Sequence, residues 1–371
     1  MLDLNPVQML HLVTMLDLNP VQMLHLVTML DLNPVQMLHL ASVRRFVASV
    51  SAVAFPGQGA QYVGMGASLV ARSEAAARVH AEADEALPGL SSIVQDGPAS
   101  RLNETRWTQP AILAHSIAVW KSVLADDALP ERPDYVLGHS LGEFSALVAA
   151  GALPFADALS IVHRRGEAMQ DAVPRGQGMM AALMPMSHAR AQDLLDAWAD
   201  AEFEDPHSAA RVVSIANVNS PSQVVISGKA QAVQDVIDLA KSSFGVRRAT
   251  KLPVSAPFHC ELMAPAATAV RAMLEALPGG LCAPAMPIVS NIDAHPRAAG
   301  GSELVDALVA QTTSSVLWYP SLEWLVDPAG GNVDTFVLIG PGTATLASFL
   351  RPLMAARTAA GGPELRVLEF E

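Results

Sequence analysis

The chain has 371 residues, of which 51% are hydrophobic and 16% charged, a composition that excludes a disordered tail and predicts a globular protein with a large core. Its 23 lysines and arginines against 36 acidic residues give a formal charge of −13, which argues against nucleic acid or an anionic membrane as the main partner. Two cysteines, Cys260 and Cys282, exclude a disulfide framework and a zinc ribbon, and the apolar runs are too short or too interrupted to span a bilayer.

The N-terminus is a repeat with no expected catalytic role. The first fourteen residues recur unchanged in the next fourteen, and residues 29–40 copy the first twelve. Each copy carries a helix-breaking proline and is too short to build a solenoid, which favours a recent duplication or an alternative start. Residues 1–46 are therefore predicted to be a repetitive extension that could act as a leader. Arg44 and Arg45, in a serine-bearing segment without acids, favour a mitochondrial address, with the cytoplasm as the alternative.

From residue 47 onward, short apolar runs alternate with longer amphipathic stretches, as in an α/β domain around a mostly parallel sheet. The first half of this pattern predicts strands at Val50–Phe55 and Tyr135–Leu137 and helices at 70–86, 110–125, Glu143–Ala150 and Ala156–Gln170. A Gly-rich turn, Pro56–Gln61, follows the first strand directly.

The alternation of short apolar runs and longer amphipathic stretches changes after Gly178. The expected elements there are strand Met179–Met184, helix Ser187–Ala201, strands Val212–Asn217 and Gln223–Ser227, helix Ala230–Ser242 and strand Arg247–Lys251. This βαββαβ order is ferredoxin-like. We therefore expect a subdomain over 178–251, inserted in a hydrolase-like three-layer α/β catalytic domain over 47–177 and 252–371. The α/β rhythm resumes with a strand near 286–290, helices at 302–311 and 320–326, and a strand at Thr335–Ile339.

The segment Gly138–Gly142 reads Gly-His-Ser-Leu-Gly and lies between a predicted strand and a predicted helix. The two glycines permit the sharp turn that lifts Ser140 above the sheet, and the helix N-terminus that follows can stabilise an oxyanion. A serine before a helix is more commonly an N-cap, but here the strand and both glycines favour a nucleophile. Its hydroxyl then needs a base.

Eleven histidines could supply that base. His259 is favoured because it lies in the apolar stretch Val254–Cys260, just after the expected subdomain and before a helix. Apart from His139, which belongs to the serine motif itself, the others lie in the repeat, in helical stretches or in polar loops, where packing or solvent-facing roles are more common. Position in the sequence alone leaves the choice of base open.

Seven motifs carry a resemblance to a known family. They are Phe55–Gln61 (FPGQGAQ), Thr108–Ala111 (TQPA), Gly138–Glu143 (GHSLGE), Arg165–Gly166 with Met169–Gln170, Asn217–Pro221 (NVNSP), Ser255–His259 (SAPFH) and Gly340–Gly342 (GPG). In this order, over about residues 50–351, they resemble the malonyl-CoA:acyl-carrier-protein transacylases. The resemblance implies a free-standing S-malonyltransferase that supplies extender units for type II fatty acid synthesis.

The resemblance also implies the catalytic roles. Ser140 would attack the malonyl thioester, with His259 as general base and then general acid. The backbone carbonyl of Gln311 would orient the imidazole, and the backbone N–H groups of Gln58 and Leu141 would form the oxyanion hole. A malonyl-serine ester splits transfer between two thiols into two similar half-reactions, which predicts ping-pong kinetics.

A further set of residues is implied to bind substrate: Arg165, Gln109, Asn217, Phe258 and His139. Arg165 lies beside the apolar stripe of its helix, where a surface arginine with its stem on the core edge would be the commoner case; the resemblance instead assigns it the free carboxylate of malonate. Phe258 would disfavour an α-methyl branch. The expected partners are malonyl-CoA and the phosphopantetheine thiol of acyl carrier protein. We expect no bound cofactor, no metal and a monomer.

Three other functions stay open. A serine hydrolase or thioesterase should show the order serine, acid, histidine and an HGGG-like loop, neither of which is evident. An acyltransferase of a polyketide pathway is the nearest rival. A non-catalytic acyl-CoA sensor is disfavoured because Ser140, His259 and Arg165 are all present.

Two local features qualify the resemblance. Where the family usually has Asn-Pro-Val after the imidazole-orienting glutamine, the chain reads Thr312–Val316 without a proline, which puts the placement of Gln311 in question. The acidic carrier also predicts a basic docking patch, for which the densest candidate is Arg247, Arg248 and Lys251 with Lys229 and Lys241. Ordinary solvated charge is an equally good interpretation of that cluster.

Overall fold

The computed structural model describes residues 49–129, 132–200 and 212–371. The predicted extension over 1–46, with its arginines, lies outside these ranges. Residues Val50–Glu371 form one compact unit. No helix in the described ranges combines the length and the apolar character needed to cross a membrane.

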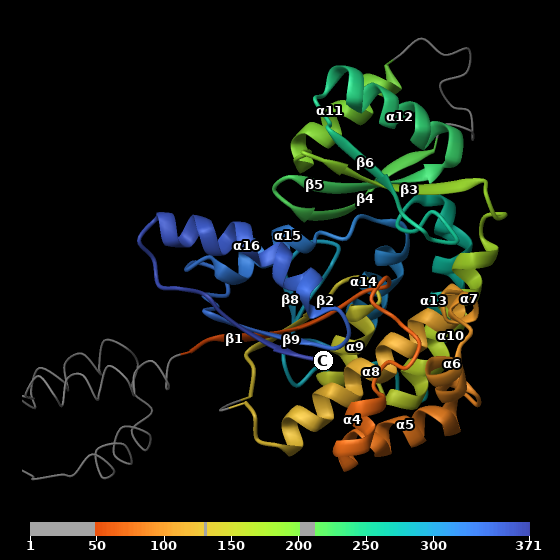
Figure 1. Cartoon of the computed structure of the whole chain (residues 1–371), viewed down its shortest axis with the longest axis vertical. Coiled ribbons are helices and arrows are strands. Elements are labelled where there is room, and N and C mark those ends of the chain that lie inside the picture. Colours follow the sequence, from red (N-terminus) through yellow and green to blue (C-terminus); the bar gives the residue numbers. More distant parts are fainter. Residues whose placement is uncertain (1–48, 130–131, 201–211) are drawn as a thin grey trace, which may run out of the picture. The chain divides into compact units, whose positions relative to one another are not determined.

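A six-stranded sheet forms the centre of the larger domain (Figure 1), in the order β10-β9-β1-β2-β7-β8. Its strands are β1 Ser51–Phe55, β2 Tyr135–Gly138, β7 Ile288–Val289, β8 Pro296–Arg297, β9 Thr335–Ile339 and β10 Arg366–Phe370. All pairings are parallel except that of β7 with β8. Consecutive parallel strands need crossover connections, and helices supply them.

The helices of the larger domain cover both faces of this sheet. They are α4 Ala67–Arg72, α5 Glu74–Ala86, α6 Leu90–Asp96, α7 Ala99–Leu102, α8 Thr105–Ala125, α9 Gly142–Ala149, α10 Phe155–Asp171, α13 Ala264–Glu275, α14 Ser302–Thr313, α15 Trp318–Val326 and α16 Thr343–Ala359, with a 3-10 turn at Glu261–Met263.

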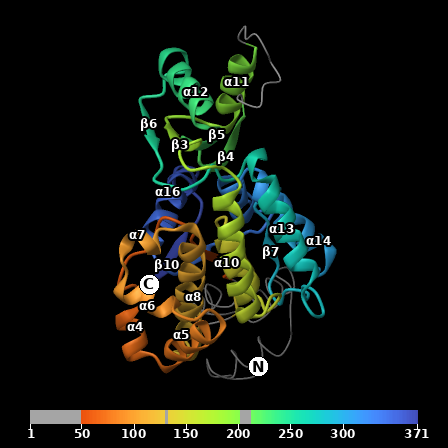
Figure 2. The ribbon, with the colours of Figure 1, turned by 90° about the vertical axis from the view of Figure 1, so that its right-hand side faces the viewer.

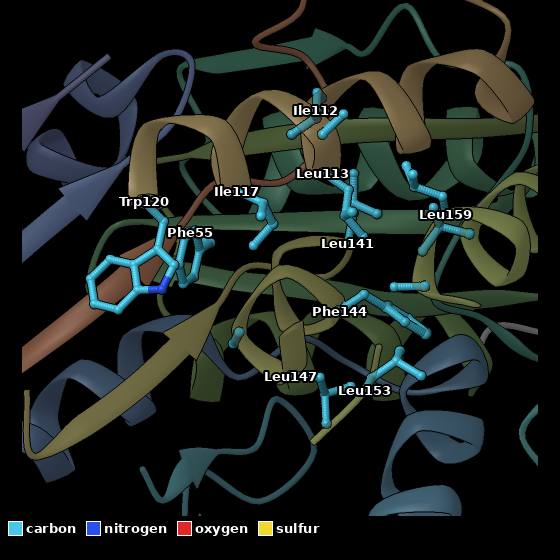
Figure 3. Packing of buried hydrophobic residues seen from close by; sticks show 14 of the residues in the cluster. Phe55, Ile112, Leu113, Ile117, Trp120, Leu141, Phe144, Leu147, Leu153 and Leu159 are labelled. Atoms are coloured by element: carbon cyan, nitrogen blue, oxygen red, sulfur yellow. The ribbon is translucent and has the colours of Figure 1, made fainter. Parts of the chain in front are cut away.

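Strand β1 shows how the two faces are filled, because successive side chains of a strand point to opposite sides. Val53 and Phe55 join the core under α5, α8, α9 and α10, whereas Ala52 and Ala54 join the core under α15 and α16. Figure 3 shows Phe55 beside Trp120 of α8. Both sides are buried, which is why β1 is a continuous apolar run in the sequence. The three-layer architecture expected for this domain is confirmed.

The second sheet has four antiparallel strands in the order β4-β5-β3-β6. It comprises β3 Gly178–Met184, β4 Val213–Ser220, β5 Gln223–Lys229 and β6 Arg248–Lys251, with helices α11 His188–Ala199 and α12 Ala230–Ser243. This is the βαββαβ order predicted for the insertion, drawn in green in Figures 1 and 2.

The two faces of the second sheet have different partners. Ala181 and Leu183 of β3 pack under α11 and α12, whereas Met180 and Ala182 share a core with Met169 of α10 and with Phe258. Each face therefore takes alternate side chains, as a strand requires. The inner face lies against the larger domain, so the junction between the two sheets is built from both.

Two predicted helices differ clearly from the observed ones. The helix expected over 70–86 is divided at Ser73, whose hydroxyl oxygen accepts from the N–H of Ala76 at 3.3 Å and caps α5. The helix expected over 110–125 begins at Thr105, so that Pro110 and Gln109 lie inside α8 and Gln109 is not at a helix start. Proline has no N–H for the carbonyl four residues earlier, that of Arg106. That carbonyl instead accepts a hydrogen bond from Nδ1 of His163 on α10, at 2.8 Å. His163 thus has a packing role that compensates for the proline.

Candidate active site

Ser140 lies in the tight turn between β2 and α9, at the carboxyl end of a central strand. Its φ of 51° is left-handed, a strained conformation for a residue with a side chain. A Cβ on Gly138 would lie 1.9 Å from the carbonyl oxygen of Gly142, and one on Gly142 would lie 2.4 Å from the carbonyl oxygen of Phe55. The two glycines of the motif are therefore required by close backbone approach, whereas the left-handed turn falls on the serine itself.

His259 meets the serine from a segment more than a hundred residues away. The Ser140 hydroxyl donates to Nε2 of His259 at 2.7 Å, and Nδ1 of the same ring donates to the backbone carbonyl of Gln311 at 2.8 Å. His259 also has a left-handed φ, of 59°. The carbonyl fixes the tautomer in which Nε2 can accept the serine proton, the arrangement a general base needs.

The surroundings of His259 keep the imidazole neutral. Burial, together with the positive charge of Arg165, lowers the pKa of His259 from 6.5 to about 3. A neutral ring is ready to take the serine proton over the whole physiological range.

This shift predicts the pH dependence of serine reactivity. Because the pKa of folded His259 is lowered, the rate at which a fluorophosphonate labels Ser140 should stay flat as the pH falls through 6.5. In an Arg165→Gln variant the pKa of His259 should rise, since one of its lowering causes is removed, and the acid limb should move to higher pH. Labelling rates measured over about pH 3–8 test this. A wild-type labelling rate that falls at low pH with an apparent pKa of 6.5 would contradict it.

Two backbone N–H groups near Ser140 are available to an oxyanion. In the described ranges the N–H groups of Gln58 and Leu141 have no hydrogen-bond acceptor. The N–H of Ser140 itself is occupied, because it donates to Oδ1 of Asn291 at 2.8 Å. Leu141 immediately precedes α9, whose positive dipole end also favours developing negative charge.

Arg165 is more deeply buried than its place beside a helix stripe suggested. It is fully enclosed, and its Nη1 and Nη2 donate to the side-chain oxygens of Gln109 and Gln311, each at 2.9 Å. Burial lowers its pKa only to about 10, so the guanidinium stays charged at neutral pH. Within the described part of the chain its Nε has no partner and no carboxylate forms an ion pair with it. A buried cation whose hydrogen bonds go to amide oxygens, and whose guanidinium lies 5.4 Å from the centre of the Phe144 ring, is suited to an incoming anion.

A cleft of about 430 Å³ opens over the serine between the two sheets. Six predicted site residues line it: Gln58, His139, Ser140, Asn217, Phe258 and His259. The other four, Leu141, Gln109, Arg165 and Gln311, lie behind this lining. Gln109 connects the two groups, since its Nε2 donates to Oε1 of Gln58 at 3.0 Å while its Oε1 accepts from Arg165.

Three residues at the site were missed by sequence reasoning. Asn291 makes two hydrogen bonds to the backbone of the serine turn. Its Oδ1 accepts from the N–H of Ser140, and its Nδ2 donates to the carbonyl of Gly138 at 2.8 Å. Asn219 accepts from Nε2 of His139 at 2.9 Å. Glu143 is buried beside Gln311. The signal for Asn291 was its position just after the buried strand β7, at the carboxyl edge where sites of α/β sheets form.

The missing proline does not displace Gln311. Val316 forms a bridge to β4, with its N–H donating to the carbonyl of Ala216 at 2.8 Å and its carbonyl accepting from Val218 at 2.9 Å. This bridge holds the segment between α14 and α15, and the carbonyl of Gln311 still faces His259.

Over the described ranges, no three His, Cys, Asp or Glu side chains gather where they could share a metal ion.

Fold and site together define an α/β enzyme of the serine acyl-transfer class, with a strained serine, a carbonyl-oriented histidine and a buried arginine. Residues 53–324 match the acyl transferase domain family. The malonyl CoA-acyl carrier protein transacylase of Bacillus subtilis is 40% identical over 289 residues, which cover 78% of this chain and 86% of that protein.

Solved structures agree with the sequence comparison. The acyl carrier protein S-malonyltransferase of Vibrio cholerae is 37% identical, with a TM-score of 0.75 and coverage of 86% of this chain and 96% of that one. A malonyl-transacylase in complex with its type II polyketide acyl-carrier protein is 36% identical, with a TM-score of 0.72 and coverage of 82% and 93%. The chain belongs to the malonyl CoA-acyl carrier protein transacylase family.

Proposed function

We propose that the protein transfers the malonyl group from malonyl-CoA to the phosphopantetheine thiol of an acyl carrier protein, through a malonyl ester on Ser140. The observation that carries the proposal is the buried guanidinium of Arg165, which forms no ion pair within the described residues and shares Gln311 with the serine–histidine pair. An acetyl group has no charge for this cation to bind, whereas malonate has a free carboxylate. The relatives named above support the assignment, since their names carry the same activity.

In the first half-reaction, His259 takes the proton of the Ser140 hydroxyl as the oxygen attacks the thioester carbonyl. The oxyanion accepts hydrogen bonds from the N–H groups of Gln58 and Leu141. As the intermediate collapses, the C–S bond breaks and His259 returns its proton to the coenzyme A thiolate. The malonyl carboxylate stays paired with Arg165. To form this pair, the guanidinium gives up one of its hydrogen bonds to a glutamine side chain.

The second half-reaction repeats these steps in reverse order. His259 removes the proton of the carrier thiol, the sulfur attacks the serine ester, and the same oxyanion site holds the charge. The Ser140 oxygen leaves with the proton from His259, which restores the resting enzyme. Two similar steps through one base explain why a single histidine is sufficient.

Steady-state assays with holo carrier protein test the proposal. Malonyl-CoA should be turned over with ping-pong kinetics and preferred to acetyl-CoA and methylmalonyl-CoA, the last because Phe258 forms part of the cleft wall. Hydrolysis of malonyl-CoA without transfer to the carrier would instead favour a thioesterase.

A polyketide pathway is the second candidate, favoured by the similarity to the malonyl-transacylase bound to a type II polyketide carrier. The acyl-transfer chemistry is the same, and only the carrier differs. Comparing kcat/KM for a fatty acid carrier and a polyketide carrier separates the two pathways. We propose fatty acid synthesis as the setting.

The basic patch at β6 is proposed to contact the acidic carrier. Arg247, Arg248 and Lys251 are exposed, and the chain continues from β6 into Leu252 and Val254, which line the cleft. The patch is therefore continuous with the edge of the site. Reversing both arginines to glutamate should raise the KM for the carrier about tenfold and leave the KM for malonyl-CoA unchanged.

A matched control for this patch is the double reversal of Arg132 and Arg366 to glutamate. Both are exposed, and they lie near the amino ends of β2 and β10, opposite the edge that carries Ser140. This control makes the same change in net charge, so it should leave the carrier KM unchanged. Equal effects of both double variants, or equal effects on both substrates, would refute the patch.

The mitochondrial address stays a prediction, based on Arg44 and Arg45 in a segment outside the described residues. A fluorescent protein fused behind residues 1–49 should enter mitochondria if the address is correct. Replacement of both arginines by glutamine should then return it to the cytoplasm. A wild-type fusion that stays in the cytoplasm would reject the address.

A further inference from the structure

Glu143 is a buried carboxylate that the proposed reaction does not use. It lies on α9, three residues after Ser140, and is 2% exposed. Its Oε2 accepts a hydrogen bond from Nε2 of Gln311 at 2.7 Å, and its Oε1 faces the N–H of Asn291 at 3.4 Å. Burial raises the pKa of this carboxyl to about 7. Burying an acid is costly, so its retention beside the nucleophile calls for a reason.

Gln311 is the residue through which Glu143 reaches the site. The backbone carbonyl of Gln311 accepts from Nδ1 of His259, and its side-chain oxygen accepts from Nη2 of Arg165. Its side-chain nitrogen donates both to Glu143 and to the backbone carbonyl of Ser140, the latter at 2.8 Å. One glutamine therefore contacts the base, the anion-binding cation and the nucleophile turn.

Three neighbours decide which way the amide of Gln311 points: Arg165, Glu143 and the backbone carbonyl of Ser140. The oxygen and nitrogen ends of an amide have nearly the same shape, so packing alone does not choose between them. A carboxylate only accepts hydrogen bonds and a guanidinium only donates them. With Glu143 and the Ser140 carbonyl accepting on one side and Arg165 donating on the other, only one orientation satisfies all three.

We propose that Glu143 is a positioning residue of the transfer reaction. Together with the Ser140 carbonyl it holds the amide oxygen of Gln311 towards Arg165, and it fixes the residue whose backbone carbonyl orients His259. The inference rests on the proposed function for its substrate, since it assigns Arg165 the malonyl carboxylate. Its effect on His259 concerns Ser140 activation with any acylating agent.

Removal of the carboxylate has two consequences that differ in their dependence on substrate. In Glu143→Ala the Ser140 carbonyl is the one acceptor left to the Gln311 amide nitrogen in the described ranges, so the amide oxygen is held less firmly against Arg165 and malonyl binding weakens. The backbone carbonyl of Gln311 is also held less firmly, which misplaces the His259 ring and slows every acylation. We expect kcat/KM for malonyl-CoA to fall about 10- to 100-fold. The malonyl-to-acetyl preference should fall as well, because only malonyl uses Arg165.

Two further variants distinguish positioning from stability. Glu143→Gln keeps an acceptor oxygen within reach of Gln311 and should restore kcat/KM to within about threefold of wild type. Glu143→Asp keeps the charge, but its side chain is one methylene shorter, which moves the carboxylate away from Gln311. This variant should therefore resemble the alanine variant. The control is Ser145→Ala, on the same helix, which removes a buried hydroxyl without a partner in the described ranges and should behave as wild type.

The experiment measures kcat/KM for malonyl-CoA and acetyl-CoA and the rate of Ser140 labelling by a fluorophosphonate, with melting temperatures for every variant. The fluorophosphonate arm needs no acyl-CoA, so slowed labelling in Glu143→Ala supports the inference even if malonyl transfer by wild type fails. The expected order in both arms is wild type, then glutamine, then aspartate and alanine. Wild-type labelling and selectivity in the alanine variant, or a glutamine variant as impaired as alanine, would overturn it.

Discussion

Replacement of Ser140 with alanine is expected to abolish the acyl-enzyme and to lower the rate of malonyl transfer by at least about 10⁴-fold. The proposed reaction passes through an ester on the Ser140 oxygen, and no other hydroxyl is paired with His259 in the described ranges. Transfer of labelled malonyl groups to holo carrier protein measures the loss.

The fold should survive this change. Alanine keeps the backbone of the turn and removes only the hydrogen bond from the Ser140 hydroxyl to His259, which contributes about 1 kcal/mol. Binding of malonyl-CoA should persist, because Arg165 is untouched. Substantial transfer by the folded variant would show that the serine is not the nucleophile.

Replacement of Arg165 with alanine is expected to remove the preference for malonyl over acetyl. The guanidinium is fully buried, and loss of one partner of a buried, hydrogen-bonded charge pair costs about 2–5 kcal/mol, so kcat/KM for malonyl-CoA should fall by roughly 10²- to 10³-fold. Acetyl-CoA forms no such pair and should lose much less. Parallel assays with the two thioesters measure the change in selectivity.

Arg164 provides a matched control for this experiment. It is the preceding residue of α10, carries the same charge and is exposed. Its replacement with alanine should leave both thioesters at wild-type rates, since surface substitutions away from special features have small effects. Equal losses for malonyl and acetyl in the Arg165 variant would contradict the role given to this residue.

The sequence was most informative where local pattern and chemistry coincide. The strand at Thr335–Ile339 was predicted with its observed limits, because a buried parallel strand is an unbroken apolar run. The serine turn was recognisable because a strand, two glycines and a helix follow in order. The βαββαβ insertion was likewise predictable, since its elements are neighbours along the chain.

The interactions that the sequence did not reveal join residues far apart in the chain. Glu143 and Gln311 are separated by 168 positions and Ser140 and Asn291 by 151, and no periodicity encodes such pairs. The start of α8 was missed because His163, on another helix, satisfies the carbonyl freed by Pro110. The full burial of Arg165 also depends on tertiary packing, since its own helix places it only beside the apolar stripe.

The central claim is that Ser140 carries the malonyl group between two thiols. Incubation with malonyl-CoA alone, followed by proteolysis and mass spectrometry, tests it most directly. The account predicts a malonyl adduct on the peptide that contains Ser140, which disappears when holo carrier protein is added. An unmodified Ser140 peptide, or an adduct on another residue that the carrier removes, would contradict it.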